Sequence, residues 1–338
     1  MNPVAELLHE EIRAHGPISF QRFMDLALYH PKHGYYTRGE DPFGREGDFY
    51  TNSQLQPVFG RLIAQQIARW RGEMGSPDEF TPEEFTPEEF TVVELGAGRG
   101  ETLAEVKKAL PSARCLAIER TEGALPQGFQ GVVYSNEFFD ALPVHLVERG
   151  ADGLAEWLVD SRDASFRWVT GGRPAGTSVA GYVDKYAAGL AEEDRIEVNL
   201  KALEQLERIA GALKRGYVLT IDYGYSAEEI AAGRRFPQGS LMAYERHQAH
   251  EDVLSEPGSR DITAHVNFTA LEQHGEDLGL ESLGLRTQAQ FLFALGEADN
   301  FATVLEAATD AETLQLRMQL KSLLFGMGET FRVLVQKK

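Results

Sequence analysis

Short apolar runs alternate with amphipathic stretches through the middle of the chain. Four runs have the length and composition of strands buried on both faces: TVVEL (91–95), ARCLAIE (113–119), GVVYS (131–135) and GYVLTIDYG (216–224). Amphipathic stretches at 100–110, 178–190 and 198–214 predict helices between or before these strands. The alternation predicts an α/β fold: a doubly wound, mostly parallel, Rossmann-like sheet with helices on both faces.

The pattern changes between residues 144 and 170. Three segments there alternate apolar and polar residues and are separated by Gly- or Asp-bearing turns: HLVER (145–149), LAEWLVD (154–160) and SFRWVTG (165–171). They predict an antiparallel β meander inserted into the parallel design. A further α/β extension is expected from about residue 226.

The amino-terminal part, 1–77, is predicted to be helical and to carry a lid. Asn2 and Pro3 suit the start of one helix, and Ser19 suits the cap of a second. Residues 33–52 are rich in glycine and aromatic side chains, which is typical of a binding loop or lid. A long helix is expected over residues 54–72.

Residues 78–90 contain the direct repeat TPEEFTPEEF and predict an acidic linker without chemistry. The repeat is too short to form a solenoid. The linker therefore separates the amino-terminal region from an α/β domain over 91–338.

The composition narrows the classes of partner. There are 52 acidic and 33 basic residues, for a net charge of −19, and such a surface repels phosphate backbones, so we expect no nucleic-acid partner. No apolar run reaches the roughly 18 residues that a membrane span needs, and the amino end does not have the pattern of a signal peptide. Cys115 is the only cysteine, which excludes disulfides within the chain. These features predict a cytoplasmic protein without a membrane partner.

The stretch VVELGAGRGETL (92–103) runs from a strand through a glycine turn into a helix. Gly96, Ala97 and Gly98 let backbone N–H groups approach a ligand closely, at a helix amino end that favours negative charge. Glu101 stands where the dinucleotide fingerprint requires its last glycine. The turn therefore predicts a nucleoside ligand other than a dinucleotide.

Two carboxylates flank this turn. Glu94 would repel a pyrophosphate but suits a ligand with an ammonium or sulfonium group. Glu119 ends the next strand, at about the separation from which an acidic residue accepts both ribose hydroxyls. The pattern is typical of the nucleoside site of a class I S-adenosylmethionine-dependent methyltransferase.

The segment YSNEFFDALP (134–143) places Asn136 and Glu137 where a buried strand reaches the edge of its sheet. Ligands of open parallel sheets bind at the carboxyl ends of the strands. Class I methyltransferases line the transferring methyl group and hold the acceptor at this position.

The chain resembles the MidA-like family, bacterial relatives of the mitochondrial complex I assembly methyltransferase. Seven motifs carry the resemblance in order: GPISFQRFMDLALYHPKHGYY, GDFYTNSQLQPVFG, VELGAGRG, NEFFDALPVH, IDYG, AYERH and DITAHVNFTAL. The resemblance implies that the protein binds S-adenosyl-L-methionine and methylates an arginine-bearing protein. Where relatives carry a longer helix and another strand, this chain has only the short segment 120–131, so the adenine wall is expected to be abbreviated there.

A guanidinium acceptor has five N–H donors in a fixed fork, which paired carboxylates can hold. Glu137 and Asp140 are the predicted pair, although Asp140 can equally cap the turn before Pro143. Asn136 is expected near the methyl or methionine end of the cofactor, or else forms an Asx turn.

Three more residues are candidates for the site. Asp48 and Thr51, in the lid motif, could reach the amino-acid end of the cofactor. His265 is expected to line the acceptor pocket, or else to be a hydrogen-bonded structural histidine. The scattered histidines do not form a convincing metal-ligand set, so no metal is expected.

Two alternative functions remain open at this point. A small-molecule O- or N-methyltransferase could use the same fold, with His145 or His265 as the base for a phenolic acceptor. An assembly factor could bind the cofactor with little catalysis. A homodimer is also left open.

Overall fold

The computed structural model describes residues 2–39, 57–75, 90–119, 124–233, 236–325 and 330–338. The chain divides into two compact units. The first unit holds residues 1–50, 139–204 and 225–271, and the second holds 51–138, 205–224 and 272–338. Asp48, Thr51 and the repeat up to residue 89 lie outside the described residues.

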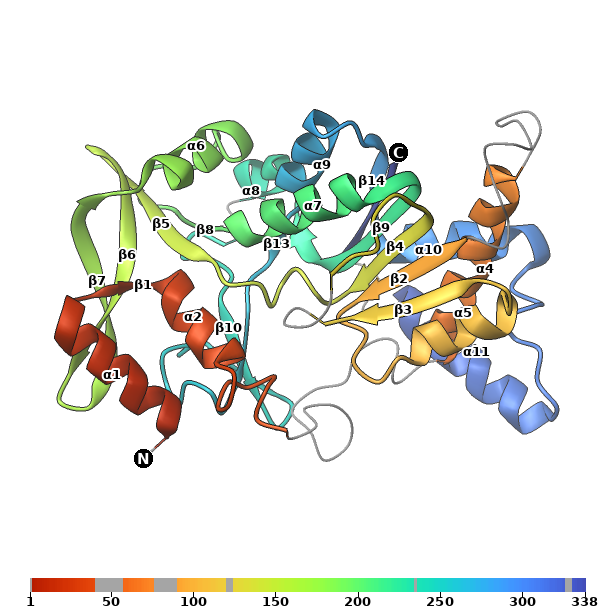
Figure 1. Ribbon diagram of the computed structural model, residues 1–338, viewed down its shortest axis with the longest axis horizontal. Helices are drawn as coiled ribbons and strands as arrows, with labels where there is room; N and C mark the ends of the chain where they lie inside the picture. The colour runs from red at the N-terminus through yellow and green to blue at the C-terminus, as the bar shows by residue number, and fades with distance from the viewer. Residues whose placement is uncertain (1, 40–56, 76–89, 120–123, 234–235, 326–329) are drawn as a thin grey trace. The chain divides into compact units, whose positions relative to one another are not determined.

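The second unit contains the predicted central sheet (Figure 1). Its strands follow one another in the order β14 (Glu281–Thr287), β15 (Phe331–Lys337), β9 (Leu213–Tyr225), β4 (Phe129–Asn136), β2 (Thr91–Leu95) and β3 (Arg114–Ile118). Neighbours from β9 to β3 are parallel, whereas β15 and β14 are added antiparallel at the other side. The mostly parallel α/β fold predicted from the sequence is confirmed.

Helices complete this unit: α4 (Pro57–Met74), α5 (Glu101–Ala109), α10 (Gln288–Gly296) and α11 (Asp310–Phe325), with the 3₁₀ turn η2 (Glu297–Asp299). Buried apolar side chains of α4, α10 and α11 form one core with those of the sheet. Trp70 of α4 stacks on Tyr217 of β9 with ring centroids 4.6 Å apart, and the Tyr217 hydroxyl donates to Glu73 at 3.0 Å. These contacts pack α4 against the sheet that ends at the glycine turn.

The first unit contains the predicted meander. Its larger sheet has the order β1 (Ile18–Ser19), β6 (Gly153–Arg162), β5 (His145–Gly150) and β8 (Arg195–Val198), with β7 (Ser165–Pro174) paired to β6. A smaller sheet has the order β11 (Gln248–His250), β10 (Met242–Glu245) and β12 (Asp261–Thr263). The pairs within both sheets are antiparallel, which confirms the predicted antiparallel insertion.

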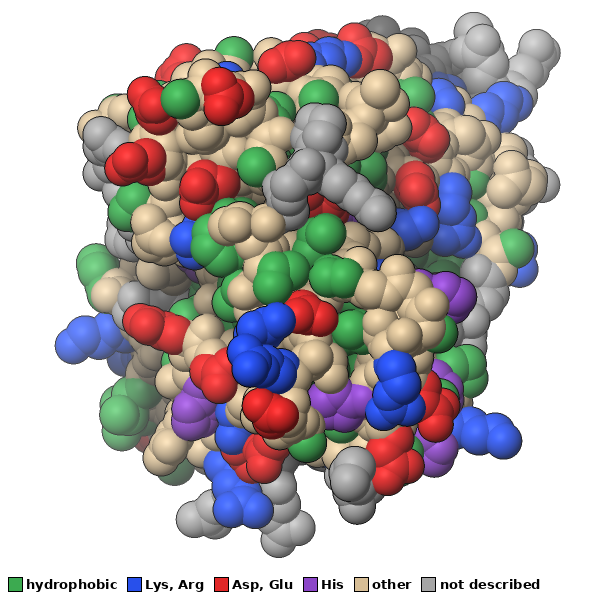
Figure 2. Space-filling model, turned by 90° about the vertical axis from the view of Figure 1, so that its left-hand side faces the viewer, with side chains coloured by type: hydrophobic (Ala, Val, Ile, Leu, Met, Phe, Trp, Pro, Cys, Tyr) green, Lys and Arg blue, Asp and Glu red, His purple; other side chains and the backbone are tan. Residues whose placement is uncertain are grey.

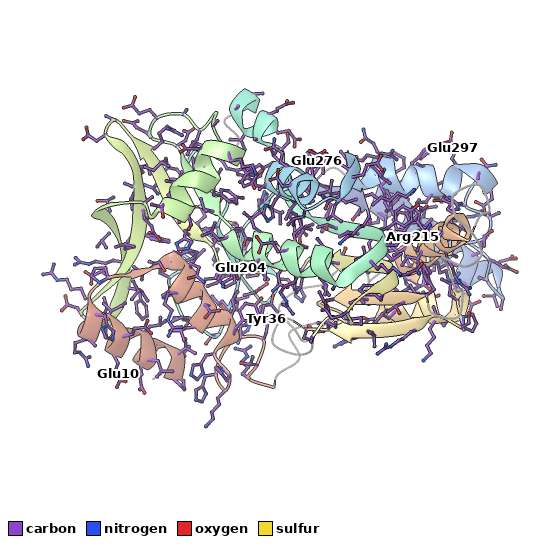
Figure 3. The ribbon with its side chains drawn as sticks, turned by 45° about the horizontal axis from the view of Figure 1, so that its top comes forward. Glu10, Tyr36, Glu204, Arg215, Glu276 and Glu297 are labelled. Atoms are coloured by element: carbon purple, nitrogen blue, oxygen red, sulfur yellow. The ribbon has the colours of Figure 1, made fainter. Side chains whose placement is uncertain are left out.

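Among the described residues, four helices lie wholly in the first unit: α1 (Pro3–His15), α2 (Phe20–Tyr29), α6 (Thr177–Tyr186) and α8 (Ala227–Gly233). The Asn2 side chain accepts the N–H of Val4, and the Ser19 side chain accepts that of Arg22, as expected for caps. The helix α1 buries a stripe with helical spacing and carries the exposed Glu10, labelled in Figure 3, on another side. Two helices, α7 (Leu200–Ala212) and α9 (Phe268–Asp277), have residues in both units, and β13 (Val266–Asn267) precedes α9.

The boundaries of two predicted helices were wrong: the helix predicted over 178–190 ends at Tyr186, and the helix predicted over 198–214 spans only Leu200–Ala212. The sequence predicts a helix over 198–214, yet Arg195–Val198 is the strand β8 and the helix α7 begins only at Leu200. The reason is tertiary: β8 pairs with β5, from His145↔Val198 to Glu148↔Arg195. The division of the chain at residues 77 and 90 stays a prediction.

Acidic side chains are not gathered into one patch on the face shown in Figure 2. Figure 2 shows carboxylates spread over the face that it presents, with basic side chains interspersed among them. Among the described helices, none combines the length and the apolar composition that a bilayer span needs.

Candidate cofactor and acceptor site

The strand order of the second unit creates a switch point between β2 and β4. After β2 the chain continues into β3, which lies on one side of β2, and it later enters β4, which lies on the other side of β2. Glu94 is paired in register with Tyr134, and Leu95 with Ser135, so the two strands end side by side. Ligands of such sheets bind in the crevice outside the carboxyl ends at this point.

The glycine turn is fixed on both sides. The N–H of Gly96 donates to the carbonyl of Ile118 at 3.0 Å, and the N–H of Gly98 donates to Oε1 of Glu119 at 3.1 Å. A Cβ atom on Gly96 would lie 2.9 Å from Cδ2 of Phe138. The turn therefore packs between the end of β3 and the segment after β4.

The geometry of the turn also requires glycine. The φ angles are +64° at Gly96, +53° at Gly98 and +73° at Gly100, in the left-handed region that costs other residues energy. Gly98 is exposed and Ala97 is half-buried. Gly100 caps α5 without a side-chain hydrogen bond, so the amino end of this helix lies beside the exposed turn.

Glu94 is buried at the end of β2, with 5% of its surface exposed. Burial raises the pKa of its carboxyl group to about 8, while the N–H of Leu103 lowers it and the nearby Glu101 and Glu119 raise it further. Its Oε2 atom has no hydrogen-bond partner among the described residues. Because the carboxyl group of Glu94 accepts a hydrogen bond from the N–H of Leu103, Glu94 also stabilises the first turn of α5.

Because Glu94 is buried, we expect its contribution to the stability of the folded protein to fall as the pH rises. Its carboxyl titrates near 4.5 in the unfolded chain and at about 8 in the folded protein, so between these values the folded protein binds the extra proton. The free energy of unfolding, measured with urea, should therefore fall with pH relative to Glu94→Gln, by about 1 kcal/mol per unit between pH 5 and 8. A constant difference between the two proteins over this range would show that Glu94 ionises normally.

Asn136 and Glu137 end β4 next to the glycine turn. Nδ2 of Asn136 donates to Oε1 of Glu137 at 2.8 Å, and Oδ1 of Asn136 has no partner among the described residues. The φ angle of Glu137 is +53°, a strained value for a residue other than glycine, while its N–H donates to Ile221 at 3.0 Å. Strain of this kind is common at ligand sites, where the surrounding structure maintains it.

Asp222 is a residue of this site that was not predicted from the sequence. It is fully buried in β9, and its Oδ2 accepts the N–H of Phe138 at 3.1 Å. It therefore fixes the segment that follows Glu137. The motif IDYG contained the signal, since it places a carboxylate at the end of an apolar strand.

Asp140 and His265 belong to the first unit. Asp140 is buried, and its carbonyl accepts the N–H of Ala264 at 2.9 Å. The N–H of His265 donates to Oγ of Ser240 at 2.9 Å, and its ring makes an edge contact with Phe236.

Three more polar residues of the first unit, Glu197, Ser240 and Tyr36, were not predicted from the sequence. Oε1 of the buried Glu197 accepts the N–H of Ser240 at 2.6 Å, so Glu197 and Ser240 together support the backbone of His265. Nothing in the surrounding sequence, RIEVN, distinguishes Glu197 from a surface residue. Tyr36, labelled in Figure 3, donates to Oδ1 of Asp261 at 2.8 Å and ties the segment after α2 to β12.

Within the described ranges, no group of three or more histidine, cysteine or acidic side chains is arranged to hold a metal ion. Asp48 and Thr51 lie outside the described residues, so their assignment stays a prediction.

The parallel sheet and the glycine turn at its switch point define a class I methyltransferase architecture. A family profile described as "Putative S-adenosyl-L-methionine-dependent methyltransferase" matches residues 118–286, and the chain belongs to this family. The cofactor of the family is S-adenosyl-L-methionine.

Similar proteins span most of the chain. The Drosophila melanogaster "Protein arginine methyltransferase NDUFAF7 homolog, mitochondrial" is 30% identical, over 82% of this chain and 70% of that protein. The Homo sapiens protein of the corresponding name is 26% identical, over 98% of this chain and 83% of that protein. A COG1565 superfamily protein from Burkholderia thailandensis, solved with bound S-adenosyl-homocysteine, has a TM-score of 0.84 and 31% identity, over 99% of this chain and 92% of that one.

Proposed function

We propose that the protein transfers a methyl group from S-adenosyl-L-methionine to an arginine side chain of a protein substrate. The relatives named as protein arginine methyltransferases support this acceptor, because they match the chain almost from end to end. The structural observation that carries the proposal is the half-buried carboxylate of Glu137, held beside the glycine turn by Asn136.

The residues of the second unit fit the cofactor. The turn formed by Gly96, Ala97 and Gly98 lies beside the amino end of α5, with Gly98 exposed, and Glu119 is suited to the ribose hydroxyls. Glu94 and Asn136 each have a buried oxygen without a partner among the described residues, as expected of groups near a polar ligand. The cofactor supplies a methyl group on a positively charged sulfur, and the protein orients the acceptor and excludes water.

Glu137 would act on the acceptor. The acceptor guanidinium is positively charged and donates in a planar fork, so a carboxylate can neutralise it and orient one nitrogen. The hydrogen bond from Asn136 fixes one oxygen of Glu137 in place. The roles predicted from the sequence stay predictions for Asp140, as the carboxylate paired with Glu137, for His265, in the acceptor pocket, and for Asp48 and Thr51, at the amino-acid end of the cofactor.

A survey of methylated arginines tests this function in cells. Proteins from cells with and without the gene are digested, and methylarginine peptides are quantified by mass spectrometry. At least one such peptide should be lost with the gene and return with the intact gene but not with the Glu137→Gln form. Identical sets of peptides would contradict an arginine acceptor.

A histidine–carboxylate pair favours one second candidate, an O-methyltransferase for small phenolic molecules. Nδ1 of His145 lies 2.6 Å from Oε1 of Glu156, an arrangement that orients a general base. His145→Gln should abolish transfer to a phenol but leave arginine methylation unchanged.

The remaining alternative is an assembly factor that binds the cofactor with little catalysis. An assay of methyl transfer from labelled cofactor distinguishes it from an enzyme, because an assembly factor of this kind would transfer little label. A cytoplasmic location, a bacterial source and a homodimer stay predictions. The curated relatives are named as mitochondrial proteins.

A further inference from the structure

Three polar side chains come together beneath the glycine turn. Glu94 on β2, Thr102 on α5 and Tyr134 on β4 have exposed fractions of 5%, 1% and 1%. Glu94 and Tyr134 are register partners in neighbouring parallel strands, so their side chains leave the same face of the sheet. The first turn of α5, which contains Thr102, is tied to Glu94 through the N–H of Leu103.

The hydrogen bonds of this trio are incomplete. Oε2 of Glu94, Oγ1 of Thr102 and Oη of Tyr134 are all buried, and none has a hydrogen-bond partner among the described residues. The hydroxyl groups of Thr102 and Tyr134 are close enough to interact, but they are not placed as donor and acceptor of a regular hydrogen bond. The hydroxyl group of Tyr134 also interacts with the carboxyl group of Glu94. Three unpaired polar atoms so close together are unusual in a folded protein, because each costs free energy.

The surroundings of Glu94 favour its neutral form. Among the described residues, four titratable groups interact electrostatically with Glu94: Glu101 on α5, Glu119 after β3, Cys115 on β3 and Tyr134 on β4. Two of these are carboxylates, and none is a cation. With a pKa of about 8, chiefly through burial, the carboxyl group of Glu94 carries a proton at neutral pH.

We propose that Thr102 and Tyr134 are positioning residues for Glu94, which releases its proton to solvent when the positively charged cofactor binds. The carboxylate formed in this way accepts hydrogen bonds from the two hydroxyl groups. The proposal rests on the cofactor placement proposed above and is independent of the acceptor.

The physical basis is linkage between the two charges. A cation near a carboxyl group favours its ionised form. Because burial raises the pKa of Tyr134 well above its ordinary value, the phenol keeps its proton and remains a donor. The affinity for the cofactor should therefore rise with pH up to about 8, relative to a protein without this carboxyl group.

Calorimetry of S-adenosylmethionine binding tests the proposal. Titrations at pH 7 in two buffers of different ionisation enthalpy count the protons released on binding by the wild-type protein and by Glu94→Gln. The amide oxygen of Gln can still accept the N–H of Leu103, and any titration of the ligand itself is common to both proteins. The wild-type protein should release close to one proton more than Glu94→Gln. The affinity ratio of the two proteins should rise about tenfold between pH 6 and 7 and less steeply between pH 7 and 8, as the pH approaches the pKa of Glu94.

Tyr134→Phe provides the second test, with Tyr217→Phe as a matched control. Tyr217 belongs to the same sheet, but its hydroxyl donates to Glu73. Tyr134→Phe should weaken cofactor binding about tenfold at pH 8 and move proton release to higher pH, whereas Tyr217→Phe should change neither. Difference infrared spectra of the wild-type protein should also lose a protonated carboxyl band on binding, which needs no Glu94 variant.

Each outcome bears on a different part of the proposal. Equal proton release by wild type and Glu94→Gln, or wild-type behaviour of Tyr134→Phe, would overturn the proposal while leaving the cofactor site in place. Absence of binding to the wild-type protein would remove the cofactor placement and this proposal together. If the cofactor binds but no arginine is methylated, only the proposed acceptor is wrong.

Discussion

Gly98→Val is expected to abolish binding of S-adenosylhomocysteine while the protein stays folded. Gly98 has a φ of +53° in the exposed part of the turn, with its N–H donating to Glu119. A branched side chain there would occupy the space of the ligand, and it would also strain the left-handed backbone. Calorimetry should show at least a hundredfold loss of affinity, that is, about 3 kcal/mol.

Gly128→Val is the matched control for this strain. Gly128 has a φ of +67° in the same unit, and a Cβ atom there would meet nothing within 4 Å. The two variants should lose similar amounts of thermal stability, but only Gly98→Val should lose the ligand. Unchanged affinity in folded Gly98→Val would show that the turn does not contact the cofactor.

Glu137→Gln is expected to retain cofactor binding but to slow methyl transfer. Oε1 of the glutamine can still accept the hydrogen bond from Asn136, so the local structure should persist. The variant loses the negative charge that neutralises a guanidinium, which costs roughly 2–4 kcal/mol at the reacting centre. Single-turnover rates should therefore fall by tens- to several-hundred-fold.

Glu105→Gln makes the same chemical change on α5, where Glu105 pairs with Lys108 at 2.6 Å. This variant should keep the wild-type single-turnover rate. If Glu137 only stabilises the turn that follows β4, Glu137→Gln should instead lose thermal stability and cofactor affinity together. Full activity of Glu137→Gln toward a verified acceptor would exclude the proposed role.

The sequence was sufficient to predict the parallel strands and the glycine turn. Apolar runs as short as TVVEL, followed at once by glycines or by Asn136 and Glu137, have few alternatives to a buried strand that ends at a sheet edge. Local signals also located the caps at Asn2 and Ser19, because capping depends on neighbouring residues.

Features that depend on distant partners could not be predicted. The strand β8 contains two charged residues and forms because β5 pairs with it. The run CLAI suggests a buried strand, yet β3 is the last strand in the described sheet order and Cys115 is only half-buried. The partial burial of β3 follows from the absence of a neighbouring strand beyond it in the described sheet.

The polar partners of the site were equally inaccessible. The sequence indicates that Glu94 lies near a ligand, but not that Leu103, Thr102 and Tyr134 surround it. Asp222 and Phe138 are 84 positions apart, and only the pairing of β4 with β9 brings them together. Such contacts are set by the register of the sheet and not by local pattern.

Direct measurement of methyl transfer tests whether the protein methylates arginine. The purified protein is incubated with methyl-labelled S-adenosylmethionine and with proteins extracted from cells that lack the gene, and the products are hydrolysed to amino acids. An arginine methyltransferase should place the label in methylated arginine, with much less from Glu137→Gln and none from Gly98→Val. Label only in other amino acids, or only in small molecules, would contradict arginine methylation.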